Sequence, residues 1–139
     1  MIFIQGGNGF LGSAILRYLK NNGINHQNIT RTNYKKFLEK KCDIFINCST
    51  NSKKYFAEKF PEKDFVETTM NVLNSINNFN FKKYILISSA DVYGTTNIRN
   101  SSENIKLNRL NHDNFYALNK IIAEQIVLNF GKPYIIFRL

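Results

Sequence analysis

Residues 1–15, MIFIQGGNGFLGSAI, constrain the fold of this chain more than any other stretch. The apolar run over residues 1–4 is too short for a helix and predicts a buried strand. Four glycines follow, and apolar residues then recur at helical spacing. The glycines are Gly6, Gly7, Gly9 and Gly12. A strand, a glycine turn and a helix in this order predict an α/β fold whose first turn binds an anion.

The glycines and their spacing indicate which kind of anion the turn binds. Glycine permits a sharp turn and removes the Cβ that would hold a pyrophosphate away from the backbone. Free N–H groups and the helix dipole then favour the anion. Gly6, Gly9 and Gly12 form GxxGxxG, which differs slightly from the dinucleotide fingerprint GxGxxG, and a glycine-rich turn without a ligand is the alternative. Phe10 and Leu11, in the same turn, are further candidate cofactor-binding residues.

The rest of the chain alternates between strand and helix patterns. Strands are predicted over residues 28–31, 43–48, 84–88 and 134–139, and helices over residues 34–41, 61–79 and 113–129. Residues 53–60 are ambiguous, and residues 94–111 form a long polar loop without periodicity. This alternation predicts one Rossmann-like α/β domain over residues 1–139. Its doubly wound parallel sheet has strand order 2-1-3-4-5, helices on both faces and a cofactor cleft at the carboxyl ends of the strands.

Helical spacing also predicts which sides of the two long helices are apolar. The apolar side of the helix at 61–79 consists of Phe65, Val66, Met70, Val72, Leu73 and Ile76. In the helix at 113–129 the residues with this spacing are Phe115, Leu118, Ile122 and Ile126.

The net charge of +9 raises the question of nucleic-acid binding. The lysines occur as scattered pairs at element ends and on helix faces, without the interleaved aromatic residues of a strand-binding surface. A solvated surface is therefore favoured over nucleic-acid binding. No apolar run approaches the length that spans a membrane.

The cysteines and histidines are too isolated to predict a metal site. Cys42 and Cys48 show no CxxC spacing and follow no signal peptide, so they are expected to be buried thiols of a reducing compartment. His26 and His112 are interpreted as surface residues. The sequence thus predicts a soluble, cytoplasmic protein.

Arg31 bears on the choice of cofactor. The end of the second predicted strand reads Thr30, Arg31, Thr32, with no carboxylate. In a dinucleotide fold an acid at this point pairs with the 2′-hydroxyl of NAD, whereas arginine accommodates the 2′-phosphate of NADP. NADP is therefore preferred over NAD, and the alternative is that Arg31 is one more surface cation.

Ser89, Tyr116 and Lys120 form a candidate catalytic unit at the predicted cleft. Ser88 and Ser89 end a strand, and the i, i+4 spacing of Tyr116 and Lys120 places both on one helix face. Ser89 would hydrogen-bond a substrate oxygen, Tyr116 would move the proton, and Lys120 would tune Tyr116 and hold the nicotinamide ribose.

Lys120 alone does not supply the free energy needed to lower the pKa of Tyr116 to near neutrality. Lowering the pKa of a tyrosine from ~10 to near neutrality requires on the order of 4 kcal/mol. An ammonium at ~5 Å, with an effective dielectric constant of ~20, supplies roughly 3 kcal/mol, and burial acts in the opposite direction. The positive ring of an oxidised nicotinamide is expected to supply the rest.

These motifs together resemble the extended short-chain dehydrogenase/reductases, specifically the NAD(P)-dependent epimerase/dehydratase group that acts on nucleotide sugars. The matching segments are GGNGFLGS, ISSADVYG and YALNKIIAE, the last of which includes Glu124. The resemblance implies hydride transfer at a sugar carbon, with Tyr116 as acid/base and Ser89 as its partner. It also implies a homodimer formed through the helices at 61–79 and 113–129. Asp91 falls where some dehydratases carry an acid, although an exposed loop aspartate is the simpler interpretation.

Two departures from this family qualify the expectation. Its members continue past the FRL strand into a substrate-binding half, and the stretch between the second and third strands is compressed here. We therefore expect the cofactor-binding half of a nucleotide-sugar epimerase, dehydratase or reductase, without the C-terminal substrate-binding region. The alternative is a non-catalytic dinucleotide-binding module without a substrate pocket.

Overall fold

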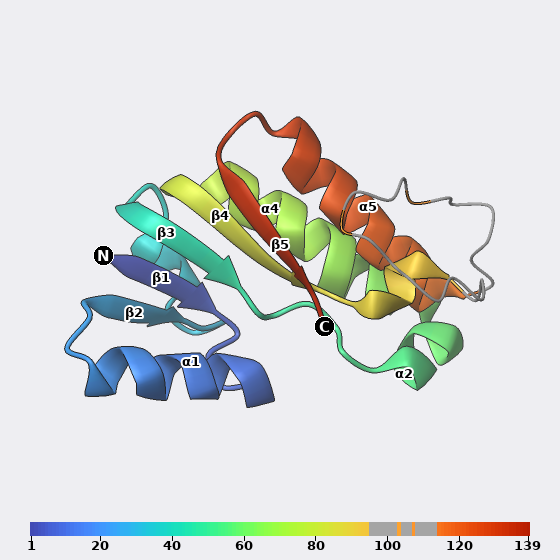
Figure 1. Ribbon diagram of the computed structural model, residues 1–139, viewed down its shortest axis with the longest axis horizontal. Coiled ribbons are helices and arrows are strands. Elements are labelled where there is room, and N and C mark those ends of the chain that lie inside the picture. Colours follow the sequence, from blue (N-terminus) through green and yellow to red (C-terminus); the bar gives the residue numbers. More distant parts are fainter. Residues whose placement is uncertain (95–102, 104–106, 108–113) are drawn as a thin grey trace.

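A five-stranded parallel sheet forms the centre of the computed structural model, which describes residues 1–94, 103, 107 and 114–139. The strands are β1 (Ile2–Gln5), β2 (His26–Ile29), β3 (Lys41–Asn47), β4 (Asn80–Ser88) and β5 (Tyr134–Arg138). All adjacent pairs are parallel, in the order β2-β1-β3-β4-β5 (Figure 1). The predicted α/β class and strand order are confirmed.

Helices and short helical turns connect the strands. The α-helices are α1 (Phe10–Asn21), α2 (Lys54–Lys59), α3 (Pro61–Phe65), α4 (Asn71–Asn78) and α5 (Phe115–Asn129). The turns are η1 (Tyr34–Phe37), η2 (Val66–Met70) and η3 (Ala90–Tyr93). Backbone angles stay helical across both junctions of η2, so α3, η2 and α4 form one helix with a π-helical turn at its middle.

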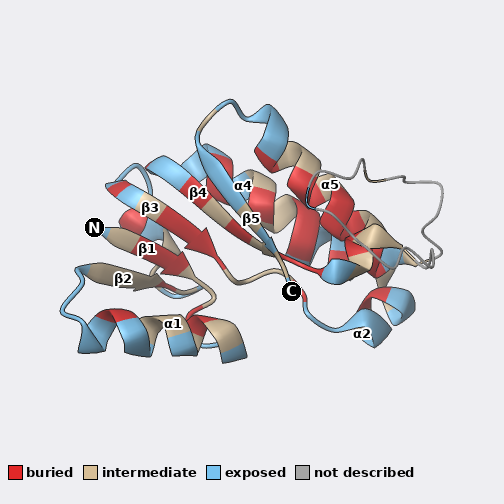
Figure 2. Cartoon of the chain, in the orientation of Figure 1, coloured by how far each residue is buried: buried red, intermediate tan, exposed pale blue. Residues whose placement is uncertain are grey.

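The two faces of the sheet bury separate apolar clusters, because successive strand residues point to opposite faces. Ile4 and Ile46 pack with Leu19 of α1 on one face. Phe3 and Phe45 belong to the larger cluster on the other face, which includes residues of α4 and α5. Figure 1 shows α1 on one side of the sheet and α4 and α5 on the other, which confirms the prediction of helices on both faces. Buried residues concentrate in β1, β3 and β4, whereas much of β5 is exposed (Figure 2).

The stretch between β2 and β3 differs from the prediction. The predicted helix at 34–41 is wrong: η1 ends at Phe37, Glu39 has φ 62°, and β3 already begins at Lys41. A positive φ is incompatible with a right-handed helix, so the helix cannot continue. The second strand also ends earlier than predicted, at Ile29, because the chain turns where the Thr30 N–H donates to Asn33 Oδ1 at 2.8 Å.

Other element boundaries shift by a few residues. β4 begins at Asn80, before the predicted 84, and the ambiguous segment 53–60 contains α2. Helix α5 begins at Phe115, capped by the Asn114 side chain, which accepts from the Ala117 N–H at 2.8 Å. The predicted helix start at 113, His112 and most of the predicted loop at 94–111 lie outside the described residues.

The predicted apolar side of the helix at 61–79 is only half right. Val72 and Ile76 are buried, but Phe65 is 40% exposed and Val66 is 59% exposed. Fully buried positions in the first half are polar instead, including Asp64. A π-helical turn contains more than 3.6 residues, so the two halves of the helix present different sequence positions to the core. Periodicity alone does not reveal this change of phase.

Helix α5 also buries a different side from the predicted one. Phe115 is 47% exposed, while Tyr116, Lys120 and Glu124 are buried. This helix contacts the sheet, η3 and each of α2, α3, η2 and α4. Because neighbours nearly surround it, α5 buries polar as well as apolar residues.

Candidate active site

The glycine turn brings the start of α1 against the end of β1 and the loop after β3. Gly6 has φ 88°, and the Gly9 N–H donates to the Gly6 carbonyl at 3.0 Å. A Cβ on Gly6 would lie 2.6 Å from the backbone carbon of Cys48, and a Cβ on Gly12 would collide with the Gly6 carbonyl oxygen. Both positions therefore require glycine, because neighbouring backbone approaches too closely to leave room for a Cβ.

The start of α1 is open to an anion. Gly9 occupies the N-cap position, and among the described residues no side chain caps the helix and no acid lies in its first turn. Phe10, the first residue of α1, is 96% exposed. The N–H groups and the positive dipole end of α1 thus face space that a ligand can reach.

Two cavities lie on either side of this turn. The first, which we call the Arg31 cavity, has a volume of about 730 Å³, and its walls include Gly6, Arg31 and Lys35. The second, the Tyr116 cavity, has a volume of about 490 Å³. Its walls include Gly9, Phe10, Leu11, Gly12, Ser89, Tyr116 and Lys120. Every site residue predicted from the sequence lies in one of these two walls.

Ser89, Tyr116 and Lys120 meet at the carboxyl end of β4. Ser89 follows β4 directly, and its hydroxyl is close enough to the Tyr116 phenol to lower the pKa of that phenol. Tyr116 is 7% exposed and Lys120 is 4% exposed. Lys120 Nζ lies 5.3 Å from the centre of the Tyr116 ring, on the same side of α5 as the tyrosine.

The protonation of this group is governed mainly by burial. Burial raises the pKa of Tyr116, against the lowering effect of the Ser89 hydroxyl, and Asp91 and Asp64 raise it further. Burial lowers the pKa of Lys120 to about 8. The lysine therefore loses its proton below the pH at which the phenol titrates, and at that pH it can no longer lower the phenol pKa. Lys120 alone does not make Tyr116 a base near neutrality.

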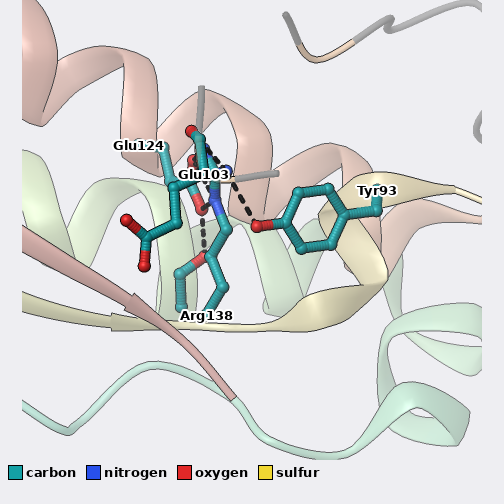
Figure 3. Close-up of polar contacts among 5 residues, drawn as sticks. Tyr93, Glu103, Glu124 and Arg138 are labelled. Atoms are coloured by element: carbon teal, nitrogen blue, oxygen red, sulfur yellow. Dashed lines mark hydrogen bonds and ion pairs between the residues drawn. The ribbon is translucent and has the colours of Figure 1, made fainter. Parts of the chain in front are cut away.

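A buried ionic network around Glu124 and Arg138 lies at the end of β4 (Figure 3). The fully buried Glu124 carboxylate accepts from Ser88 Oγ at 2.6 Å and from Arg138 Nη2 at 2.8 Å. Arg138 Nε lies 3.1 and 3.2 Å from the same two carboxylate oxygens, and its Nη1 donates to the Tyr93 hydroxyl at 3.2 Å. The network thereby joins β4, β5, α5 and η3 at the point where Ser89 leaves the sheet.

Further polar residues at the site were not predicted from the sequence. Thr50 lines the Tyr116 cavity and accepts from Lys120 Nζ at 2.6 Å. Asp64 is fully buried and accepts from Asn51 and Asn119, each at 2.7 Å. The position of Thr50 just after a parallel strand is a signal that could have found it, because clefts form at the carboxyl ends of such strands. Asp64 has no comparable signal.

Asp91 lies in η3, partly exposed, in the wall of the Tyr116 cavity. Its carboxylate accepts from Lys54 Nζ at 3.3 Å. An ion pair with this exposure contributes little to stability. The structure therefore puts Asp91 beside the candidate catalytic residues without assigning it a role.

Cys42 and Cys48 are both free thiols, of which Cys42 is buried and Cys48 partly buried. Burial raises the pKa of each to about 11, so neither is a reactive thiolate near neutrality. His26 Nδ1 lies 2.7 Å from the Ile24 carbonyl, in a half-buried position at the start of β2.

Within the described part of the chain, no group of three or more His, Cys, Asp or Glu side chains is arranged to hold a metal ion. The helices of that part are all too short or too polar to cross a bilayer.

Comparison with solved structures gives many matches at low sequence identity. UDP-N-acetylglucosamine 4-epimerase from Methanobrevibacter ruminantium M1 has a TM-score of 0.79 and 20% identity, covering 99% of this chain and 53% of that one. A short-chain dehydrogenase/reductase superfamily protein from Agrobacterium tumefaciens, with bound NAD, has a TM-score of 0.82 and 14% identity, and the match covers 99% of this chain and 48% of that one. The dTDP-4-dehydrorhamnose reductase from Bacillus anthracis, in complex with NADP, has a TM-score of 0.79 and 21% identity, and the match covers 99% of this chain and 52% of that one.

These likenesses show the fold, and the chain spans about half the length of the solved structures it matches. No curated protein matches it by sequence. The model of the NAD dependent epimerase/dehydratase family matches residues 2–139, which is nearly the whole chain. With the glycine turn at the start of α1, and with Ser89, Tyr116 and Lys120 in one cavity, the chain belongs to the NAD dependent epimerase/dehydratase family.

Proposed function

We propose that residues 1–139 form the cofactor-binding half of an NAD(P)-dependent enzyme that epimerises, dehydrates or reduces a nucleotide sugar. The observation that carries this proposal is that Ser89, Tyr116 and Lys120 line one cavity together with the glycine turn. Similar solved structures include a nucleotide-sugar epimerase and a nucleotide-sugar reductase, which supports this substrate class. Residues that bind the sugar would come from outside this span.

The residues of the turn fit a dinucleotide. Gly6, Gly9 and Gly12 have no side chains, so the backbone at the start of α1 is open to a pyrophosphate. A cavity lies on each side of the turn. Arg31 in the first cavity would hold a 2′-phosphate, so we propose NADP as the preferred cofactor and NAD as the alternative. Lys120 in the second would hold the nicotinamide ribose. When bound, the nicotinamide ring supplies the hydride acceptor or donor.

Tyr116 is proposed as the acid/base and Ser89 as its partner. The Ser89 hydroxyl would orient the phenol and contact the same substrate oxygen, which its effect on the Tyr116 pKa supports. Because burial raises the pKa of Tyr116, the phenol holds its proton at neutral pH. Only the phenolate can accept a proton from a sugar hydroxyl, so a positive charge beside Tyr116 is needed to favour loss of the phenol proton, and the protonated Lys120 contributes part of that charge.

We also propose a homodimer through the helices at 61–79 and 113–129. The exposed Phe65 and Val66 on the first of these support it, whereas α5 offers few exposed side chains. Sedimentation equilibrium that gives a monomer at micromolar concentration would contradict this assembly. The proposed location is the cytoplasm, which free thiols at Cys42 and Cys48 support and cell fractionation can test.

Cofactor binding and turnover test the main proposal separately. Titration with NADPH and NADH, followed by fluorescence, measures whether the turn and its cavities bind a dinucleotide. Hydride exchange with UDP- and dTDP-sugars is then compared between the wild type and Tyr116→Phe, which we expect to lose at least a hundredfold in rate. Tyr18→Phe, on the exposed side of α1, is the matched control.

Binding of NADPH without Tyr116-dependent exchange would reject the enzyme and favour the alternative, a non-catalytic dinucleotide-binding module. Failure to bind either dinucleotide would reject both.

A further inference from the structure

We propose that Thr50 is a positioning residue that fixes the ammonium of Lys120 beside Tyr116. The inference deepens the proposed function, since positioning Lys120 affects catalysis only if Lys120 serves Tyr116. Thr50 follows β3 in the chain, far from α5 in sequence, and lines the cavity that contains both residues.

The hydrogen bonds of Thr50 have a fixed direction. Lys120 Nζ lies 2.6 Å from Thr50 Oγ1, and an ammonium can only donate, so the threonine oxygen accepts. Thr50 Oγ1 lies 3.4 Å from the carbonyl oxygen of Ile87, which can only accept, so the hydroxyl proton points to Ile87. The hydroxyl thus joins the lysine of α5 to the backbone of β4 in one orientation.

Lys120 needs such a partner because it is 4% exposed and a buried ammonium is costly without hydrogen bonds. The charged groups that face it are Asp64 from α3 and Glu124 on α5. Asp64 is engaged by amide side chains, and Glu124 by Ser88 and Arg138. Among the described residues, the hydrogen-bond partner of Lys120 Nζ is Thr50.

Fixing the ammonium also fixes its distance from the phenol. The lysine side chain is a flexible four-carbon stem, so its ammonium has no defined position unless a partner binds it. Held by Thr50, Nζ lies 5.3 Å from the centre of the Tyr116 ring. Thr50 therefore sets how strongly Lys120 acts on Tyr116.

The test compares Thr50→Val, which keeps the shape and removes the hydroxyl, with Thr50→Ser, which keeps the hydroxyl. Thr69→Val is the matched control, because it removes another buried threonine hydroxyl that bonds α5, at the Asn119 carbonyl. NMR of lysines labelled at Cε follows the titration of Lys120, whose signal is assigned by its loss in Lys120→Met. Circular dichroism verifies that each variant is folded.

We expect Thr50→Val to lower the proton affinity of Lys120 about tenfold, because the ammonium loses a charge-assisted hydrogen bond. Thr50→Ser and Thr69→Val should titrate like the wild type. An unchanged titration in Thr50→Val overturns the inference, and so does an equal change in Thr50→Val and Thr50→Ser.

Turnover provides a second readout. Thr50→Val should lower kcat with little change in KM and should shift the pH profile, whereas a merely structural loss would move neither the profile nor the Lys120 titration. The NMR titration needs neither cofactor nor substrate. A wild type that neither binds dinucleotide nor turns over would therefore remove the proposed function, while the titration still decides the role of Thr50.

Discussion

Arg31 is exposed in the turn after β2 and lies in the wall of the Arg31 cavity. Under the proposed function, Arg31→Ala should weaken NADPH binding about tenfold or more and leave NADH binding nearly unchanged, because only NADPH carries the 2′-phosphate that arginine would bind. Fluorescence titration of both dinucleotides measures the difference. Lys36→Ala, an exposed cation that does not line the cavity, is the control. Equal losses for the two dinucleotides would remove the argument for NADP.

Glu124 illustrates how a single buried charge supports the fold. Its ion pair with Arg138 has side-chain exposures of 0% for Glu124 and 15% for Arg138. Glu124→Gln should lower the free energy of unfolding by about 3 kcal/mol, because Arg138 then loses its counter-charge in a buried position. Urea unfolding measures the loss. Glu58→Gln, exposed on α2, should change it by less than about 0.5 kcal/mol. Similar free energies of unfolding for the two variants would show that the ion pair of Glu124 and Arg138 does not stabilise the fold.

At the scale of elements, two glycines with left-handed backbone conformation can be compared: Gly6 in the glycine turn before α1 and Gly23 after α1. Gly6 has φ 88° and Gly23 has φ 64°, so alanine at either position is strained. A Cβ on Gly23 meets no atom within 4 Å, whereas one on Gly6 runs into the backbone of Cys48. Gly23→Ala should therefore cost about 1 kcal/mol and leave dinucleotide binding intact. Gly6→Ala should cost about 1–3 kcal/mol more and abolish binding.

Urea unfolding and NADPH titration of the two variants check this expectation. If both lose the same stability, the close approach of Gly6 to Cys48 does not matter. If Gly23→Ala also loses binding, the effect of Gly6→Ala cannot be assigned to the turn.

The elements that the sequence predicts well are those with one clear signal. The apolar runs of β1, β3 and β4, and the glycines before α1, are local, and they lead to the confirmed sheet order. The failures are places where tertiary contacts override a local pattern. The π-helical turn η2 rotates Phe65 out of the core, and the neighbours of α5 bury its polar side. Neither effect has a signature in the spacing of apolar residues.

The candidate site divides in the same way. The i, i+4 spacing of Tyr116 and Lys120, and the place of Ser89 at a strand end, could be read from the chain, and the structure brings all three to one cavity. The contacts of Thr50 and Arg138 join segments far apart in sequence, so no local pattern announces them.

For the molecule as a whole, buried thiols predict a loss of stability in alkali. The pKa of Cys42 and of Cys48 is about 11, against an ordinary value of 9.0, because burial disfavours the thiolate. The unfolded chain therefore releases these protons first, and stability is lost as the pH rises from 9 to 11, by on the order of 2 kcal/mol for each thiol. Burial also raises the pKa of Tyr84, which adds to the loss above pH 10. Burial raises the pKa of Tyr116 in the same way. Lys120, with its pKa lowered to about 8, acts in the opposite direction up to about pH 10.5 and offsets part of this loss.

Urea unfolding at pH 8 and at pH 10.5, under reducing conditions, measures the net effect. We expect a lower free energy of unfolding at pH 10.5 and a shallower fall in Cys42→Ala, which removes one of the thiols. A free energy that stays constant or rises over this interval would contradict the buried-thiol explanation.

The position of the glycine turn between the two cavities has a consequence for how ligands compete. Residues 6 and 9 belong to one turn yet line different cavities. Under the proposed function a dinucleotide is a bivalent ligand, and its affinity gains from the effective concentration that each half confers on the other. Adenosine 2′,5′-bisphosphate should then displace NADPH from the Arg31 cavity while leaving Tyr116 accessible. The affinity of the whole dinucleotide should exceed that of either half by far more than the contacts of its pyrophosphate alone supply.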